Sequence, residues 1–156
     1  MGKNLNLFSP KAMIQTEEYI PQKVLIIDDQ PTICAIYAKI LKDLGVAQVD
    51  ISSSGTNGLR QYMTDLPDVV LLDIKMPGMD GLDVISEIRA FDPDSNVIML
   101  TSVSDKGTVV NSLQKGAKSY ILKTEEAGAV KQRLKSIFKK LDFNRNRIFR
   151  NVRKSA

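Results

Sequence analysis

The chain has 156 residues, of which 43% are apolar, and a net charge of +4, so it is large and apolar enough to fold as one domain. It contains no histidine and one cysteine, Cys34, which excludes a Ser-His-Asp triad, a Cys-His pair, histidine-bound zinc, a phosphohistidine and an internal disulfide. No apolar stretch is long enough to span a bilayer, and the first twenty residues lack the apolar core of a signal peptide. A cytoplasmic protein is the simplest interpretation.

Residues 1–22 show no sustained periodicity and contain Pro10 and Pro21, so we interpret them as a flexible leader. From residue 23 onward, short apolar runs alternate with amphipathic segments. The apolar runs predict five strands, at residues 23–27, 47–52, 68–73, 96–101 and 119–122. The amphipathic segments predict five helices, over residues 31–44, 56–64, a stretch capped by Asp80, 105–115, and a last one containing Val130 to Leu141.

Strands that alternate with helices indicate an α/β fold, with a parallel sheet covered by helices on both faces. Within residues 68–73, Val69 to Leu72 are apolar without alternation, which is typical of a strand buried on both sides. For five such units with right-handed crossovers, the flavodoxin-like strand order 2-1-3-4-5 is a common solution. We therefore expect one domain over residues 23–141, between the leader and a basic tail at residues 142–156.

Positive charge is concentrated at the C-terminal end. Residues 1–130 hold 12 Lys/Arg and 17 Asp/Glu, a balance of −5, whereas residues 131–156 hold 10 Lys/Arg and one Asp, a balance of +9. A solvated, partly disordered end is the ordinary interpretation of such a segment. Binding to nucleic acid, anionic lipid or an acidic partner is the alternative.

Polar side chains lie where four of the predicted strands end. Asp28 and Asp29 follow the first strand, Asp73 ends the third, Thr101 ends the fourth and Lys123 follows the fifth. In a parallel sheet of this order, the carboxyl ends of the first and third strands meet at the switch point where binding sites form. Each residue alone could be a helix cap, a strand end or a solvated charge. The occurrence of all five at strand ends is difficult to attribute to capping.

Three carboxylates in one place repel each other unless a cation lies among them, and Mg²⁺ suits a few carboxylates with backbone oxygen and water. A Mg²⁺ ion held by Asp28, Asp29 and Asp73 would leave one oxygen of Asp73 free as a nucleophile. Carboxylates in that role form aspartyl phosphates. Thr101 could then donate a hydrogen bond to the phosphoryl group, and Lys123 could pair with its charge.

The stretches LIIDDQP, DVVLLDIKMPGMDGLDVI, VIMLTS and GAKSYILKT resemble the receiver domain of bacterial two-component response regulators, such as the single-domain chemotaxis response regulators. The resemblance covers roughly residues 23–141. It implies a phosphoacceptor signalling protein that is not an enzyme in its own right, although it assists its own phosphotransfer and dephosphorylation. It also implies a partner histidine kinase or phosphotransfer protein, and a downstream protein target.

The resemblance also assigns roles to individual residues. Asp73 would accept the phosphoryl group, and Mg²⁺ would be bound by Asp28, Asp29, Asp73 and the backbone carbonyl of Lys75. Thr101 and Lys123 would contact the phosphoryl group. Tyr120 matches the aromatic residue that turns inward when Thr101 moves, although it could simply be a half-buried strand residue. The surface over residues 105–141 would report the change to the target.

The sequence departs from the family at one position next to the site. The residue after the lysine is usually a proline in a cis peptide, and here it is Thr124. A cis bond without proline costs about 3 kcal/mol, so we expect a trans peptide. We also expect Thr124 to cap the last helix, with Glu125 and Glu126 in its first turn.

Two other functions remain open. A phosphatase of the haloacid-dehalogenase type also uses an aspartyl nucleophile, but it needs a second acid where this chain has Lys75. Alternatively, the basic tail could make this a nucleic-acid- or membrane-binding protein with a regulatory body, acting through phosphates without base readout. The last helix could also continue into the tail and bury Ile148, Phe149 and Val152 against a partner or a second copy. Its asparagines argue weakly against a continuous helix.

Overall fold

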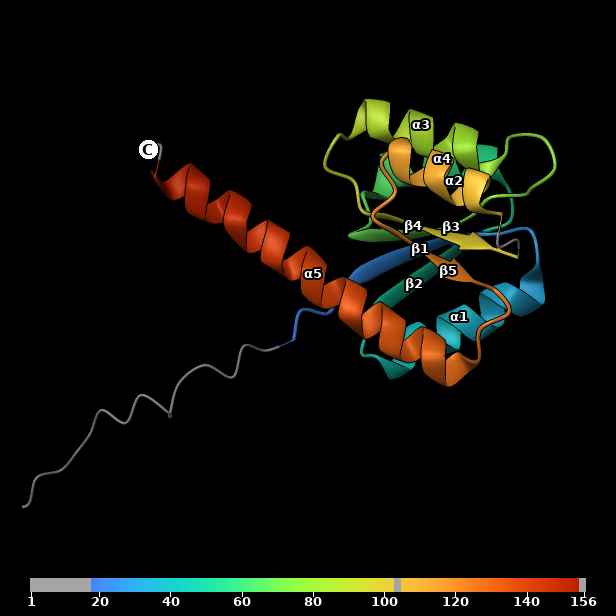
Figure 1. The fold of residues 1–156 in the computed structure, drawn as a ribbon, viewed down its shortest axis with the longest axis horizontal. Coiled ribbons are helices and arrows are strands. Elements are labelled where there is room, and N and C mark those ends of the chain that lie inside the picture. The colour runs from blue at the N-terminus through green and yellow to red at the C-terminus, as the bar shows by residue number, and fades with distance from the viewer. Residues whose placement is uncertain (1–17, 103–104, 155–156) are drawn as a thin grey trace, which may run out of the picture.

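A computed structural model describes the backbone of residues 18–102 and 105–154 and the side chains of those up to Leu141. Within these residues, five parallel strands form one sheet in the order β2-β1-β3-β4-β5, as predicted (Figure 1). The strands are β1 Lys23–Ile27, β2 Gln48–Ser52, β3 Val69–Asp73, β4 Val97–Thr101 and β5 Ser119–Leu122. The helices are α1 Pro31–Asp43, α2 Gly55–Asp65, α3 Gly81–Phe91, α4 Lys106–Gln114 and α5 Ala127–Lys154.

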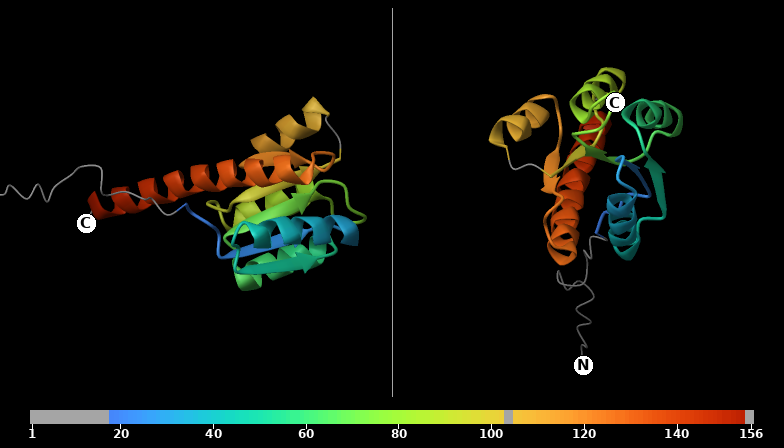
Figure 2. Two further views of the ribbon diagram at one scale, coloured as in Figure 1. Left: turned by 90° about the horizontal axis from the view of Figure 1, so that it is seen from below. Right: turned by 90° about the vertical axis from the view of Figure 1, so that its right-hand side faces the viewer.

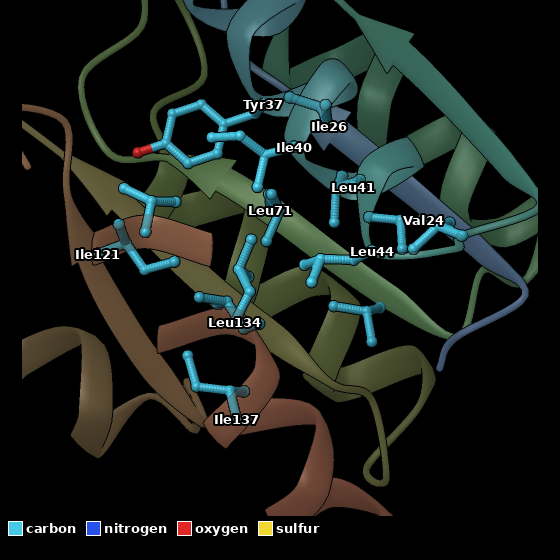
Figure 3. Close-up of a cluster of buried hydrophobic side chains, with 14 of the residues drawn as sticks. Val24, Ile26, Tyr37, Ile40, Leu41, Leu44, Leu71, Ile121, Leu134 and Ile137 are labelled. Atoms are coloured by element: carbon cyan, nitrogen blue, oxygen red, sulfur yellow. The ribbon is translucent and has the colours of Figure 1, made fainter. Parts of the chain in front are cut away.

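The sheet has a hydrophobic core on each face. Successive residues of a strand point to opposite faces, so Val24 and Ile26 of β1 pack under α1 and α5, whereas Leu25 and Ile27 pack under α2 and α3. Figure 3 shows the first of these cores, in which Leu134 of α5 lies among the residues of α1 and the sheet. All five residues of β3 are buried, in agreement with the continuous apolar run from Val69 to Leu72.

Local sequence signals set several helix ends. Pro31 occupies the first turn of α1, where its missing N–H leaves no hydrogen bond unmade. The Asp80 carboxylate accepts a hydrogen bond from Asp83 N–H at 2.9 Å and so caps α3, as predicted. Gly45 and Gly116 follow α1 and α4 with φ of +97° and +103°, a backbone conformation that glycine adopts without steric cost.

The described end of the predicted leader is packed against the domain. Tyr19 and Ile20 are partly buried against the core formed with α1 and α5. The Gln22 carbonyl accepts a hydrogen bond from Gln48 N–H at 2.9 Å, and the Asp68 carboxylate accepts one from Gln22 N–H. Residues 18–22 therefore belong to the folded unit, and residues 1–17 lie outside the described part of the chain.

The last helix continues well past the predicted domain boundary. α5 has 28 residues and is unbroken to Lys154, so the asparagines of its second half do not interrupt it. The left view of Figure 2 shows its C-terminal part extending beyond the sheet and the other helices. Among the described helices, none is long and apolar enough to cross a membrane.

Candidate phosphoacceptor site

Three carboxylates meet at the carboxyl edge of the sheet. β1 and β3 are neighbours with Ile27 level with Leu72, so the residues that follow, Asp28 and Asp73, lie side by side. Ligand oxygens of Asp28, Asp29 and Asp73 all lie within 4.8 Å of one another. Asp28 is 1% exposed and Asp73 is 4% exposed, and Asp29 is the most exposed of the three. The sequence-based expectation that these acids converge is therefore met.

The Lys123 ammonium lies between two of these carboxylates. Its Nζ is 2.6 Å from Asp28 Oδ2 and 3.1 Å from Asp73 Oδ1, and the side chain is only 7% exposed. The backbone N–H of Lys123 donates to the Thr101 carbonyl at 2.8 Å, which fixes the lysine at the end of β5. Buried carboxylates need such a partner, since an unpaired charge away from water is costly.

One residue of the site was missed by the sequence reasoning. Gln30 accepts a hydrogen bond from Lys123 Nζ at 3.2 Å through its side-chain oxygen, and its backbone N–H donates to Asp28 Oδ1 at 2.9 Å. Gln30 is also the N-cap residue of α1, yet its side chain makes no capping bond. Glutamine is an unusual choice at that position, and this was the signal that could have identified it.

The other predicted residues lie around this cluster. Thr101 is buried at the end of β4, one residue beyond Leu100, which is level with Asp73. Lys75 has an exposed side chain, and its backbone N–H hydrogen-bonds to the Asp73 carboxylate. Tyr120 is half-buried on β5 against the core beneath α2 and α3, and its carbonyl accepts a 3.4 Å hydrogen bond from Arg133 of α5.

The lone cysteine is buried next to Asp28. The Cys34 thiol is 3% exposed and donates to the Asp28 carbonyl at 3.4 Å. Burial, reinforced by the Asp28 charge, raises the pKa of the Cys34 thiol. A raised pKa keeps the thiol protonated at neutral pH, the form in which a cysteine is a poor nucleophile.

Burial sets the protonation behaviour of Asp73. Removal from water, and then the neighbouring Asp28 carboxylate, raise the pKa of Asp73 to about 6, against the opposing effect of the Lys123 ammonium. The carboxylate is still ionised at neutral pH and is more basic than an ordinary aspartate. Greater basicity favours attack on an electrophile, because the oxygen lone pairs are less stabilised by their surroundings.

This raised pKa predicts that Asp73→Asn stabilises the metal-free protein. The pKa of Asp73 in the folded protein, about 6, lies above the usual value of about 3.9, so ionisation of Asp73 destabilises the fold. This destabilisation is complete above about pH 6 and absent below about pH 4. In urea unfolding with EDTA, the Asn variant should be more stable than the parent by about 1 to 3 kcal/mol at pH 7.5. The difference should vanish near pH 4. Asp94→Asn, at an exposed loop carboxylate, is the control and should show no such trend.

The donor set fits a hard divalent cation. Mg²⁺ prefers a few carboxylates together with backbone oxygen and water, and this cluster supplies three carboxylates at suitable spacing. Asp28 Oδ2 is buried and accepts no hydrogen bond from the described part of the chain; its contact with Lys123 is an ion pair. Three carboxylates share one ammonium, so the cluster keeps negative charge that a cation would balance.

The loop after Lys123 differs from our expectation in one respect. Its peptides are trans, as expected, but Thr124 does not cap α5, which begins at Ala127. The Glu125 N–H donates to the Leu122 carbonyl at 3.0 Å, and the Glu125 carboxylate accepts from Leu122 N–H at 3.1 Å. These two bonds close a tight turn over residues 122–125, so the helix starts later. The Glu125 carboxylate also pairs with Arg133 at 3.2 Å, which ties the turn to α5.

Comparison with known proteins agrees with this geometry. Residues 24–135 match the response regulator receiver domain family. The chemotaxis protein CheY of Listeria monocytogenes is 37% identical over 117 residues, which cover 75% of this chain and 98% of that protein. CheY of Treponema pallidum is 31% identical over 121 residues, or 76% of this chain and 84% of that protein.

Solved structures show the same relationship. A chain in the CheX-CheY-BeF3-Mg²⁺ complex from Borrelia burgdorferi is 35% identical with a TM-score of 0.72, covering 76% of this chain and 90% of that chain. A response regulator receiver domain protein from Clostridium thermocellum is 32% identical with a TM-score of 0.71, covering 81% and 98%. The chain belongs to the response regulator receiver domain family. It is similar to CheY proteins and carries the fold of a two-component signalling domain.

Proposed function

We propose that this protein is a single-domain response regulator in which Asp73 accepts a phosphoryl group from a partner histidine kinase or phosphotransfer protein. The observation that carries the proposal is the placement of Asp73, a buried carboxylate at the edge of the sheet that shares the Lys123 ammonium with Asp28. An ion pair alone would explain one acid and one lysine. It does not explain a third carboxylate, Asp29, within 4.8 Å.

In the proposed reaction, an Asp73 oxygen attacks the phosphorus of the donor. A new P–O bond forms as the bond from phosphorus to the donor nitrogen or oxygen breaks, and the donor leaves with that electron pair. Asp28, Asp29, Asp73 and the Lys75 carbonyl would hold Mg²⁺, which supplies positive charge beside the transferring group. Lys123 is already within 3.1 Å of Asp73 and would transfer its pairing to a phosphoryl oxygen.

Thr101 and Tyr120 carry the proposed response. Thr101 would donate a hydrogen bond to the phosphoryl group, and its movement would open space into which Tyr120 turns. Tyr120 lies on β5 between α4 and α5, and its carbonyl is already bonded to Arg133 of α5. The α4-β5-α5 surface would then present a changed face to a downstream protein. The Borrelia burgdorferi complex, which pairs CheX with CheY in the presence of BeF3 and Mg²⁺, supports a partner protein of this kind.

The wild-type chain tests this function directly. With acetyl phosphate and Mg²⁺, intact-protein mass spectrometry should show addition of one phosphoryl group per chain, and EDTA should prevent it. A generic phosphate ester should give no sustained release of inorganic phosphate. Sustained turnover would instead favour the aspartyl phosphatase, and a chain that takes up no phosphoryl group from several small donors would refute the proposal.

Lys75 should control how long the phosphoryl group lasts. Its exposed ammonium lies two residues from Asp73 and near the Asp105 carboxylate, whose pKa is lowered by hydrogen bonds from Thr108 and Gly107 and, to a smaller extent, by Lys75. Lys75→Ala should change the rate of phosphoryl loss about twofold to tenfold, because a nearby ammonium affects how a water molecule reaches the phosphoryl group. The free energy of unfolding should change by less than about 1 kcal/mol, since exposed charges contribute little to folding.

The matched control is Lys118→Ala, which removes another exposed lysine just before β5, at the end of that strand away from Lys123. Dephosphorylation is followed by the decay of the phosphorylated mass after the donor has been removed. If both lysine variants decayed at the wild-type rate, Lys75 would have no part in the chemistry.

A further inference from the structure

α5 has two parts with different surroundings. Its first part packs on the domain, with Leu134 fully buried, Phe138 2% exposed and Leu141 6% exposed. The helix then continues for 13 residues, from Asp142 to Lys154, which at 1.5 Å per residue adds about 20 Å. In Figure 1 this second part extends from the body without another element beside it. The packed part of α5 nucleates this extension, but most helical stability in proteins comes from packing of an apolar face, so a packing partner would stabilise it.

The sequence of α5 follows a seven-residue repeat across both parts. If Phe138 is assigned position a, then Leu134, Leu141 and Ile148 fall at d, and Val152 falls at a. Apolar a and d positions are the pattern with which helices pair. The apolar stripe with which the first part of α5 packs on the domain therefore continues, in the same register, along the second part.

Basic residues avoid this stripe. Between residues 138 and 154 the helix carries seven Lys/Arg, and only Arg145 occupies an a, d, e or g position. The others fall at the outer b, c and f positions: Lys139, Lys140, Arg147, Arg150, Arg153 and Lys154. The e and g positions of the extension are Asp142, Asn144, Phe149 and Asn151, so no like charges flank the apolar stripe. Two such helices could approach along it without repulsion between their many cations.

We infer that the second part of α5, residues 141–152, packs against the same segment of a second copy of this chain. A self-complementary stripe is what an isologous dimer requires. Arg145 stands at a single a position, and one polar residue there lowers the stability of a helix pair while fixing its register. The dimer is therefore weak, and the fraction of dimer changes with protein concentration. This surface is separate from the phosphoacceptor site and does not depend on the function proposed for it.

Two substitutions of the same kind distinguish the stripe from the general charge of the tail. Arg145→Leu places an apolar residue at the one polar a position, whereas Arg147→Leu makes the identical chemical change at an outer c position. Sedimentation equilibrium of the full chain over about 10 µM to 1 mM should show a weak dimer. Arg145→Leu should tighten it at least about tenfold, and Arg147→Leu by less than about threefold. Deletion of residues 142–156 should leave a monomer that still takes up one phosphoryl group.

Three results would overturn the inference. The first is a wild-type chain and an Arg145→Leu variant that are both monomeric at every concentration. The second is equal tightening by the two leucine substitutions, which would indicate nonspecific apolar association. The third is a wild-type chain that stays monomeric but binds duplex DNA or anionic vesicles through residues 142–156, which would assign the extension to a polyanion.

Discussion

Replacing Asp73 with Asn should abolish phosphoryl uptake from acetyl phosphate with Mg²⁺. The amide has almost the same shape as the carboxylate but lacks the charged oxygen that forms the new P–O bond. We expect neither neighbour to substitute, because Asp28 Oδ2 is paired with Lys123 at 2.6 Å and Asp29 is the exposed member of the cluster. Mass spectrometry of the intact protein should show no added phosphoryl mass in the variant, against one per chain in the parent.

Loss of folding would not explain this result, because the same variant is expected to be more stable than the parent at neutral pH without metal. Asp94→Asn, at an exposed position away from the site, should label like the parent. Equal labelling of the Asp73→Asn protein would remove Asp73 from its proposed role and leave Asp28 or Asp29 as the acceptor to examine.

Replacing Gly81 with Ala should both destabilise the fold and impair the site. Gly81 is the first residue of α3, and its N–H donates to the Ile74 carbonyl at 2.8 Å. A Cβ at this position would overlap the Asp73 carbonyl oxygen and lie 2.8 Å from Ile74 Cα. These are backbone atoms, so either the helix or the end of β3 must move. Overpacking of this kind should cost about 2 to 3 kcal/mol and displace Asp73.

Gly128→Ala is the matched control for this substitution. It lies in the first turn of α5, where an added Cβ meets no atom within 4 Å. Alanine is the better helix former, so this variant should be neutral or more stable by up to about 1 kcal/mol. Urea unfolding and the rate of phosphoryl uptake are measured for both. A Gly81→Ala protein with unchanged stability and uptake would show that α3 is not held against the site.

The sheet and the acidic cluster were predictable because their signals are local and redundant. The doubly buried run of β3 could hardly be anything but a central strand, and a parallel order places the end of β1 beside it. Asp28 and Asp73 then lie at one edge of the sheet, independently of the conformation of the loops between the strands. Pro31, Asp80 and Gly116 marked helix ends through backbone chemistry that acts within a few residues.

The features that escaped prediction depend on contacts between distant segments. The Gln30 side chain bonds to Lys123, 93 positions away; the unusual N-cap glutamine marks the residue, but no local signal identifies its partner. The turn before α5 is closed by Glu125, whose side chain bonds back to the strand instead of joining the helix. Tyr19 and Ile20 pack on a core whose composition is set by α1 and α5. Periodicity carries no information about such pairings.

Lys123 is held from two directions, by its backbone N–H on the Thr101 carbonyl and by its ammonium between two carboxylates. A free lysine side chain loses up to about 2 kcal/mol of rotamer entropy when it is immobilised. Here that loss is incurred when the chain folds, before any phosphoryl donor arrives. The lysine is therefore preorganised: an incoming anion finds the ammonium already restricted, and its arrival exchanges one negative partner for another.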